Sequence, residues 1–118
     1  MISKQYRLKE REVKKVLQRG KPFFSYGIVL NYTKNKFGYN RFAIVIGSKS
    51  VLNNVSRCFF RRKFYTQVQS TIEQQTNGSY YDFVFVVKKQ TKLVKKSEES
   101  EKNFQKDIQF LRNKVIKK

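Results

Sequence analysis

The stretch RFAIVIGSKSVLNNVSRCFFRRKF, residues 41–64, predicts a strand, a polar connection and a helix in succession. In its first part, Phe42, Ile44 and Ile46 share one face if the backbone is extended. In its last part, apolar side chains begin to recur every four residues, which predicts a helix with one buried face. These positions are Phe60, Phe64, Val68 and Ile72. We expect the stripe to pack against a sheet as core.

The predicted helix also carries a run of basic residues: Arg57, Arg61, Arg62 and Lys63. No Asp or Glu occurs anywhere between Glu12 and Glu73. A solvated helix face normally mixes charges of both signs, because like charges one turn apart destabilise a helix. The planar guanidinium of Arg can donate two hydrogen bonds to one phosphate. The pattern therefore favours a phosphate-binding surface over an ordinary solvated face.

The composition bounds the class of protein. The chain has 118 residues, 27 Lys and Arg against 8 Asp and Glu, and a formal net charge of +19. A disordered polycation would lack the 39% apolar and 15% aromatic residues found here. We expect one folded domain spanning residues 1–118. A compact domain with this charge repels itself, which points to a polyanionic partner.

The segments before residue 41 predict a helix and one or two strands. Apolar spacing over residues 8–19 predicts a short amphipathic helix that ends at Gly20. The run FFSYGIVLNY, residues 23–32, is rich in β-branched and aromatic residues and predicts a strand, whole or split in two. Because a short polar segment joins it to residues 41–47, we expect these two strands to form an antiparallel pair.

The segments after the basic helix complete the fold. The nearly continuous apolar run YYDFVFVV, residues 80–87, predicts a strand buried on both faces. Residues 97–118 predict a C-terminal helix packed on the domain, with Ser97 as its cap and acidic residues in its first turn. Its expected buried seam is Phe104, Ile108, Leu111 and Val115. The predicted order is α-β-β-(β)-α-β-α, an α+β fold built as a small α/β sandwich.

The missing residue types exclude most catalytic chemistry. The chain has no His, so it lacks an imidazole base or metal ligand, and one cysteine, Cys58, cannot form an internal disulfide or a zinc site. The acidic cluster Glu98, Glu99 and Glu101 is better explained as a helix start than as a metal site. We therefore predict no catalytic and no metal-binding residue. No signal peptide or membrane span is recognisable, so we expect a cytoplasmic protein.

Two weaker features also suggest contact with a nucleic acid. Lys49, Asn53 and Asn54 lie in the connection that enters the basic helix, where backbone amides and an ammonium group can hold a phosphate. Tyr32 lies near a strand end next to two lysines, where its ring can stack on an unpaired base. Asn is equally common as a turn or cap residue, and most aromatic residues here are expected in the core.

Four segments together resemble the protein subunit of bacterial ribonuclease P: YRLKEREVKKVLQRGK, IVLNY, the stretch 41–64 and YYDFVFVVKK. The resemblance covers roughly residues 6–112. In that family a strand and a Ser-Lys-Lys-type turn lead into a helix with an Arg-Asn-Arg-x-Lys-Arg core. Arg57 matches its first Arg, and Cys58 and Phe59 replace the following Asn and Arg. Val13 stands where the family often has Phe.

The resemblance implies a fold, a function and a set of site residues. The implied fold has a left-handed β-α-β crossover. The implied function is that of a non-catalytic subunit of a ribonucleoprotein, in which a catalytic RNA removes the 5′ leader of precursor tRNA using Mg²⁺. Its partners are that RNA and precursor tRNA, with no membrane and no protein partner required. By position, the resemblance implies RNA binding by Lys49, Arg57, Arg61 and Arg62. Asn53 and Lys63, singled out above from the residues alone, complete the predicted RNA-binding set. Val13, Leu17 and Tyr32 are implied near a cleft for the leader.

Two other functions share the charge and composition. A structural RNA-binding protein, such as a ribosomal protein, has the same excess of Lys and Arg and needs no catalytic group. An autonomous nuclease is disfavoured by the missing carboxylate and imidazole groups.

Overall fold

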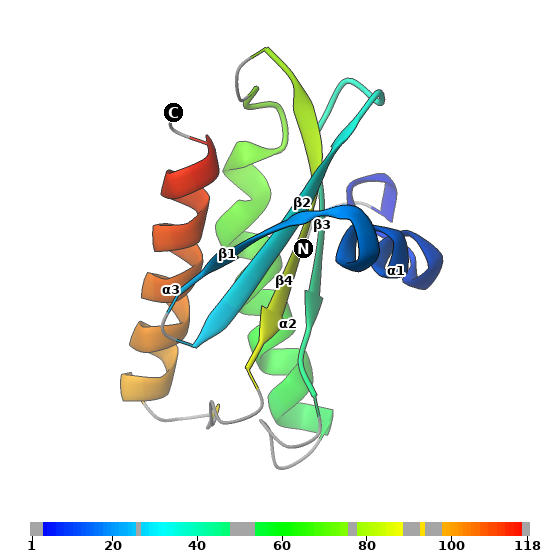
Figure 1. The fold of residues 1–118 in the computed structure, drawn as a ribbon. Coiled ribbons are helices and arrows are strands. Elements are labelled where there is room, and N and C mark those ends of the chain that lie inside the picture. The colour runs from blue at the N-terminus through cyan, green and yellow to red at the C-terminus, as the bar shows by residue number, and fades with distance from the viewer. Residues whose placement is uncertain are drawn as a thin grey trace.

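The computed structural model describes residues 4–25, 27–47, 54–75, 78–88, 93 and 98–116 (Figure 1). Its helices are α1 (Glu10–Arg19), α2 (Asn54–Val68) and α3 (Glu98–Ile116), and its strands are β1 (Lys21–Phe24), β2 (Ile28–Asn35), β3 (Arg41–Val45) and β4 (Tyr80–Val87). Two short 3₁₀ turns are η1 (Lys4–Tyr6) and η2 (Gln69–Thr71). The predicted order is confirmed, with residues 23–32 split between β1 and β2. Ser97 and the side chain of Val115 lie outside the described residues.

The four strands form one mixed sheet in the order β1-β2-β4-β3. β1 pairs antiparallel with β2, β2 pairs antiparallel with β4, and β3 pairs parallel with β4. The prediction that residues 28–32 and 41–47 pair with each other is wrong, because β4 lies between them. The physical reason is the sequence of β4, whose residues 81–85 are all buried. A strand that is apolar on both faces buries most surface at the centre of a sheet.

The connection from β3 through α2 to β4 has an uncommon hand. In Figure 1 both strands run downward, α2 lies behind the sheet, and the lower part of β4 lies to the left of β3. This arrangement is a left-handed crossover, whereas about 98% of such connections are right-handed. The left-handed crossover implied by the family resemblance is therefore present.

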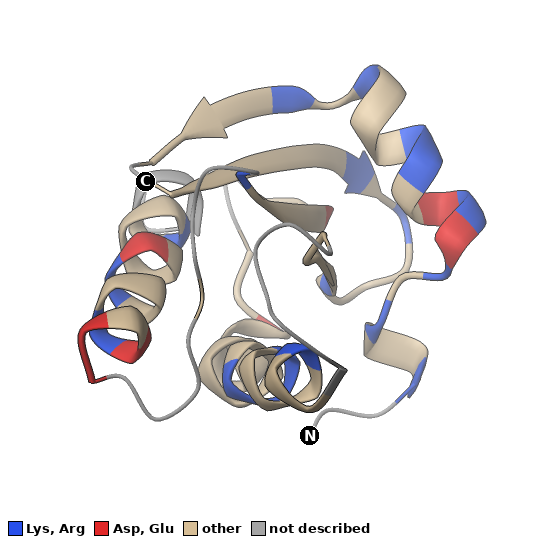
Figure 2. Ribbon diagram, turned by 90° about the horizontal axis from the view of Figure 1, so that it is seen from below, with Lys and Arg blue, Asp and Glu red and all other residues tan. Residues whose placement is uncertain are grey.

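α2 and α3 cover one face of the sheet, and α1 lies on the opposite side (Figure 2). The apolar stripe of α2 is confirmed as core, since Phe60, Phe64 and Val68 have no exposed surface. The Phe64 ring lies edge-on to Phe85 of β4, with ring centroids 5.0 Å apart. Ile72 lies beyond the end of the helix and is also buried. These contacts fix both the position and the rotation of α2.

α3 packs beside α2 through its predicted seam, in which Phe104, Ile108 and Leu111 are buried. Asp107 of α3 adds hydrogen bonds to the turn between β1 and β2. Its carboxylate accepts hydrogen bonds from the Ser25 hydroxyl at 2.6 Å and from the Gly27 backbone at 3.1 Å. The turn between β1 and β2 is thereby held against α3.

α1 is attached to the sheet through a network centred on the buried Arg41. Its guanidinium donates to both carboxylate oxygens of Asp82, at 2.9 and 2.7 Å, and also to Glu12 of α1. Burial raises the pKa of Glu12, but hydrogen bonds from the Lys9 backbone and from Arg41 outweigh this effect, so the pKa is lowered overall. Burial lowers the pKa of Arg41, but its carboxylate partners raise it overall. The contacts of the network therefore favour the ionised forms of both Glu12 and Arg41 in the folded state.

The C-terminal end of α1 approaches the sheet at Gly20. A Cβ atom at this position would lie 2.6 Å from the Val16 carbonyl oxygen and 2.9 Å from that of Tyr32. Both atoms belong to the backbone and cannot move aside without distorting α1 or β2. Only glycine therefore fits where α1 meets the sheet. Within the described ranges, no helix has both the length and the apolar character needed to cross a membrane.

Replacing Phe64 with Ala is expected to lower the free energy of unfolding by about 3–5 kcal/mol, because it removes a fully buried ring between α2 and β4. Urea unfolding followed by circular dichroism measures the change. Phe110→Ala is the matched control, since Phe110 is 50% exposed on α3, and a change of about 1 kcal/mol or less is expected there. Equal effects of the two substitutions would contradict the assigned core.

Candidate nucleic-acid interface

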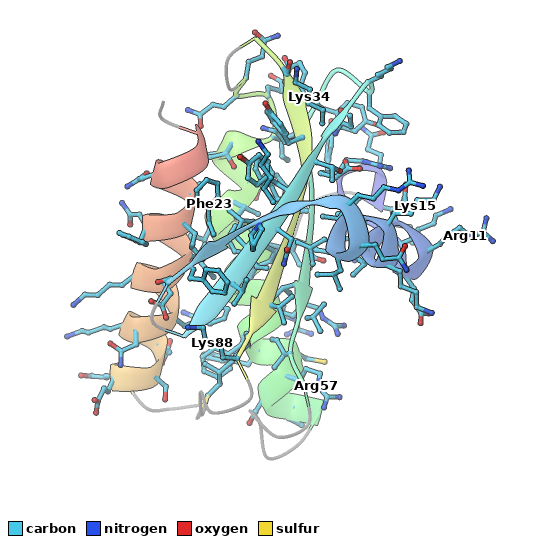
Figure 3. The ribbon with its side chains drawn as sticks, viewed as in Figure 1. Arg11, Lys15, Phe23, Lys34, Arg57 and Lys88 are labelled. Atoms are coloured by element: carbon cyan, nitrogen blue, oxygen red, sulfur yellow. The ribbon has the colours of Figure 1, made fainter. Side chains whose placement is uncertain are left out.

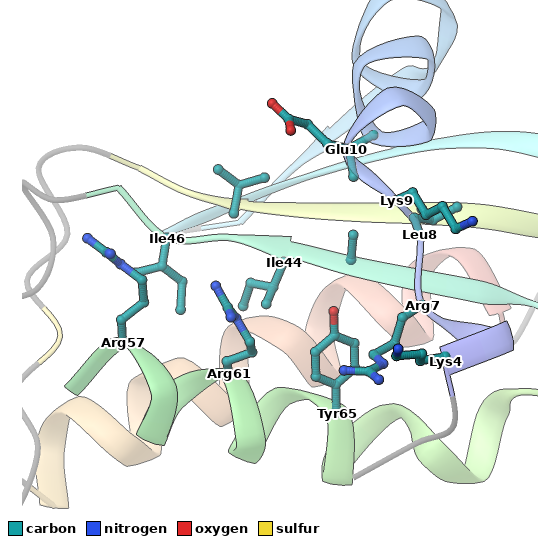
Figure 4. Close-up of a pocket in the computed structure, with 13 residues that line it drawn as sticks. Lys4, Arg7, Leu8, Lys9, Glu10, Ile44, Ile46, Arg57, Arg61 and Tyr65 are labelled. Atoms are coloured by element: carbon teal, nitrogen blue, oxygen red, sulfur yellow. The ribbon is translucent and has the colours of Figure 1, made fainter. Parts of the chain in front are cut away.

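A groove of about 700 Å³ lies where the N-terminal segment, β3 and α2 meet (Figure 4). Its floor is formed by residues 43–46, at the outer edge of the sheet. One wall is the segment from η1 to the start of α1, and the other is α2 from Arg57 to Tyr65. We call it the basic groove, after the cations that line it among the described residues: Lys4, Arg7, Lys9, Arg57 and Arg61.

The α2 wall presents Arg57, Arg61 and Tyr65, which are spaced by one helical turn. The burial of Phe60 and Phe64 on the sheet directs these side chains along the flank of the helix and over the floor. In Figure 4 the two guanidinium groups point upward from α2 toward β3. α2 contains no acidic residue, as Figure 2 shows.

The opposite wall is held in place by hydrogen bonding to β3. The Leu8 backbone N–H donates to the Phe42 carbonyl at 2.9 Å, and Arg7 forms a parallel bridge with the same residue. This contact covers only the first part of the outer edge of β3. Residues 43–46 continue beyond it and face the groove.

Arg7 and Tyr65 bring the two walls together at one end of the groove. The Arg7 guanidinium lies 6.0 Å from the centre of the Tyr65 ring, within range of a cation–π interaction. Burial raises the pKa of Tyr65, while the positive charges of Arg61 and Arg7 oppose the increase. Tyr65 therefore keeps its proton at neutral pH and offers a hydroxyl group beside two guanidinium groups.

The floor of the groove is mainly apolar. Val45 is 37% exposed, and Val13 of α1 is half-buried at the groove. Among the described residues that line the groove, Glu10 is the one acidic residue, and it forms an exposed ion pair with Lys14 at 3.8 Å. A strip of apolar surface between two rows of cations suits a single-stranded nucleic acid, whose phosphates and bases need different surroundings.

The family model described as Ribonuclease P matches residues 2–113. The chain belongs to the ribonuclease P family. This membership confirms the resemblance drawn from the sequence and implies a subunit of a ribonuclease involved in tRNA processing. No curated protein matches the chain significantly by sequence.

Solved structures of ribonuclease P proteins share the fold. The RNase P protein of Staphylococcus aureus has 15% identity and a TM-score of 0.70, over 94% of this chain and 97% of that one. A mutant of that protein with defective mRNA degradation activity has 17% identity and a TM-score of 0.72, over 95% and 91%. The RNase P protein of Thermotoga maritima, in complex with 1-(4-fluorophenyl)-2-thiourea, has 19% identity and a TM-score of 0.59, over 88% and 87%. The α+β fold is thus that of ribonuclease P proteins.

The basic groove gathers three of the predicted site residues of this ribonuclease P chain: Arg57, Arg61 and Val13. Arg62 and Lys63 face a second groove, between α2 and α3. There Lys63 forms an ion pair with Glu101 at 3.3 Å. The predicted residues Lys49 and Asn53 lie outside the described residues, as does the side chain of Asn54.

The other two residues predicted at the leader cleft do not line the basic groove. Leu17 is exposed on α1. Tyr32 lies on the sheet face covered by α2 and α3, where its ring stacks on Phe23 with centroids 5.5 Å apart and packs against Phe83. Val13 packs instead with the small apolar cluster beneath α1. The sheet therefore separates the side chains of Tyr32 and Val13.

Sequence reasoning missed Lys4, Arg7, Lys9 and Tyr65 as groove residues. The spacing of Arg57, Arg61 and Tyr65 is a local signal that predicts one shared helix flank. The N-terminal cations carry no such signal, because pairing of their segment with β3 brings them to the groove. Figure 3 shows that Arg11 and Lys15, from the same basic region, point away from the sheet.

The double variant Arg57→Ala, Arg61→Ala is expected to bind folded RNA more weakly and with a shallower dependence on salt. Each phosphate that the variant no longer neutralises removes roughly 0.7–0.9 from the slope of log affinity against log salt. Fluorescence anisotropy over a series of KCl concentrations measures this slope. Lys106→Ala is the control, since Lys106 is exposed on α3 and lines neither groove. An unchanged slope in the double variant, or an equal fall in the control, would refute the assignment.

Proposed function

We propose that this chain is the protein subunit of a bacterial-type ribonuclease P. In this proposal it binds the catalytic RNA and the 5′ leader of precursor tRNA, and it assists Mg²⁺-dependent endonucleolytic removal of the leader. The observation that carries the proposal is the basic groove, in which cations from two separate segments flank an apolar strip. Membership of the ribonuclease P family supports the same function.

The proposed division of labour follows from the side chains available. Cleavage of a phosphodiester commonly uses metal-bound water or a general base. The chain has no His, and among its described residues no three His, Cys, Asp or Glu side chains are grouped closely enough to hold a metal ion. The proposal therefore assigns Mg²⁺ and the cleavage step to the RNA. The protein supplies binding and orientation.

The arginines of the groove act on the RNA backbone. Arg57 and Arg61 each present a planar guanidinium that can donate two hydrogen bonds to one phosphate. Neutralising phosphates releases condensed counterions, which favours binding and makes it sensitive to salt. Partial replacement of counterions by fixed arginines would also let the RNA adopt its active structure at a lower Mg²⁺ concentration.

The unpaired leader is proposed to enter the same groove. Val13 and Val45 offer apolar surface for its bases, while cations on both walls hold its phosphates. Leu17, exposed on the same helix as Val13, extends this surface if the leader follows α1. The Tyr32 ring, which packs beneath α2 and α3, is not part of the proposed contact. Membership of the ribonuclease P family supports the cytoplasm as the proposed location.

The test is reconstitution with a bacterial ribonuclease P RNA and a precursor tRNA. At a Mg²⁺ concentration too low for the RNA alone, adding the protein is expected to accelerate release of the 5′ leader. The Arg57→Ala, Arg61→Ala variant should need more protein for the same effect, whereas Lys106→Ala should match the parent. The RNA-free protein should leave the substrate intact.

Two outcomes would overturn the proposal. If the protein binds the RNA but cleavage is no faster, a structural RNA-binding role fits better. Cleavage by RNA-free protein would instead indicate an autonomous nuclease, provided that it persists after treatment with a ribonuclease specific for single-stranded RNA and renewed purification.

A further inference from the structure

A second groove, of about 610 Å³, lies between α2 and α3 on the other flank of α2. We call it the α2–α3 groove. Its α2 side carries Phe59, Arg62, Lys63 and Gln67, and its α3 side carries Gln105 and Gln109. None of these residues lines the basic groove. The groove therefore differs in position and in chemistry from the site described above.

Contacts between described residues join the two helices at the α2–α3 groove. The Lys63 ammonium pairs with Glu101 of α3 at 3.3 Å. The Arg112 guanidinium of α3 donates to the Gln67 backbone carbonyl at 2.7 Å. Between the helices, Phe60 and Phe104 meet edge-on with centroids 5.2 Å apart. These contacts hold the two sides of the groove in place.

One polar atom at this groove lacks a partner. The Gln67 side-chain amide donates from Nε2 to the Gln105 backbone carbonyl at 2.9 Å. Its Oε1 is enclosed by neighbouring atoms and has no hydrogen-bond partner among the described residues. Buried acceptors without a donor are uncommon in folded proteins. The hydrogen bond from Nε2 holds the Gln67 amide in one orientation beside the groove.

Phe59 supplies an aromatic ring at the same groove. The ring is half-buried and is supported by an edge-on contact with Phe60, with centroids 5.2 Å apart. The Lys63 ammonium lies 5.4 Å from its centre, so a positive charge already lies beside the ring. Arg62 is exposed on the same helix, where it can reach a phosphate near the groove.

We propose that the α2–α3 groove binds one unpaired base of an RNA, stacked on Phe59. The glutamine amides carry both donors and acceptors, as the edge of a base does, and Arg62 holds the adjoining phosphate. An acidic peptide is a poorer match, because Glu101 already neutralises Lys63. An apolar helix is a poorer match because three glutamines line the groove. This inference rests on the proposed RNA-binding function and adds a base-binding subsite to it.

The subsite gives α2 two different contacts with RNA. The flank at the basic groove presents Arg57 and Arg61 to phosphates, and this contact depends strongly on salt. The flank at the α2–α3 groove offers stacking, which removes no charge and depends much less on salt. The two contributions are therefore separable in a binding experiment.

The experiment compares Phe59→Leu with the parent protein in binding an eight-nucleotide oligo(A) and a ribose-phosphate chain of equal length without bases. Leu keeps apolar bulk but removes the π face. Affinity for oligo(A) is expected to fall on the order of tenfold, since stacking on an aromatic ring is worth about 1–3 kcal/mol per base. The salt slope and the affinity for the abasic chain should stay unchanged. Phe110→Leu, at an exposed phenylalanine of α3, should leave both affinities as they are.

A second variant tests the glutamine side of the subsite. Gln109→Ala, at an exposed position of α3, should weaken binding of oligo(A) several-fold and spare the abasic chain. The inference is overturned if both variants bind oligo(A) as the parent does, or if they lose affinity for both probes equally. A parent protein that binds neither oligo(A) nor folded RNA would overturn the proposed function as well, so the two failures are distinguishable.

Discussion

Burial of one aromatic stripe determines how α2 presents its charges. Phe60 and Phe64 are wholly enclosed between α2, the sheet and α3. Their burial fixes which face of α2 points to the core. The side chains on the two flanks of α2 are then fixed in position. Arg57 and Arg61 lie over β3, and Phe59 lies beside α3. A cationic helix without this anchor would be destabilised by its own repulsion. Core packing thus provides the free energy that holds like charges together.

Four of the eight acidic residues connect elements of the fold. Glu12 and Asp82 hold Arg41 between α1 and β4, Asp107 holds the turn between β1 and β2, and Glu101 pairs with Lys63. With 27 Lys and Arg against 8 Asp and Glu, most of the positive charge has no acidic partner within the chain. The lowered pKa of Glu12 is consistent with this structural role. The protein therefore combines a well-connected interior with a surface that attracts a polyanion.

Local patterns in the sequence predicted the elements and the core more fully than the site. The four-residue spacing of Phe60 and Phe64, and the apolar run of β4, are properties of short segments and were confirmed. The insertion of β4 between β2 and β3 was missed, because strand pairing depends on segments far apart in the chain. Arg7 reaches the basic groove through the same kind of long-range pairing. The α2–α3 groove depends on the packing of two helices, so the sequence of neither helix alone predicts it.

In the proposed function, cations from two separate segments form a single RNA-binding groove around the edge of β3. The most direct test is NMR observation of the arginine Nε–Hε groups during titration with folded RNA. The resonances of Arg7, Arg57 and Arg61 should shift together with one apparent affinity, while that of Arg11, which points away from the sheet, should respond weakly. RNA binding that leaves the groove resonances unmoved, or that shifts Arg11 most strongly, would show that the RNA does not bind in this groove.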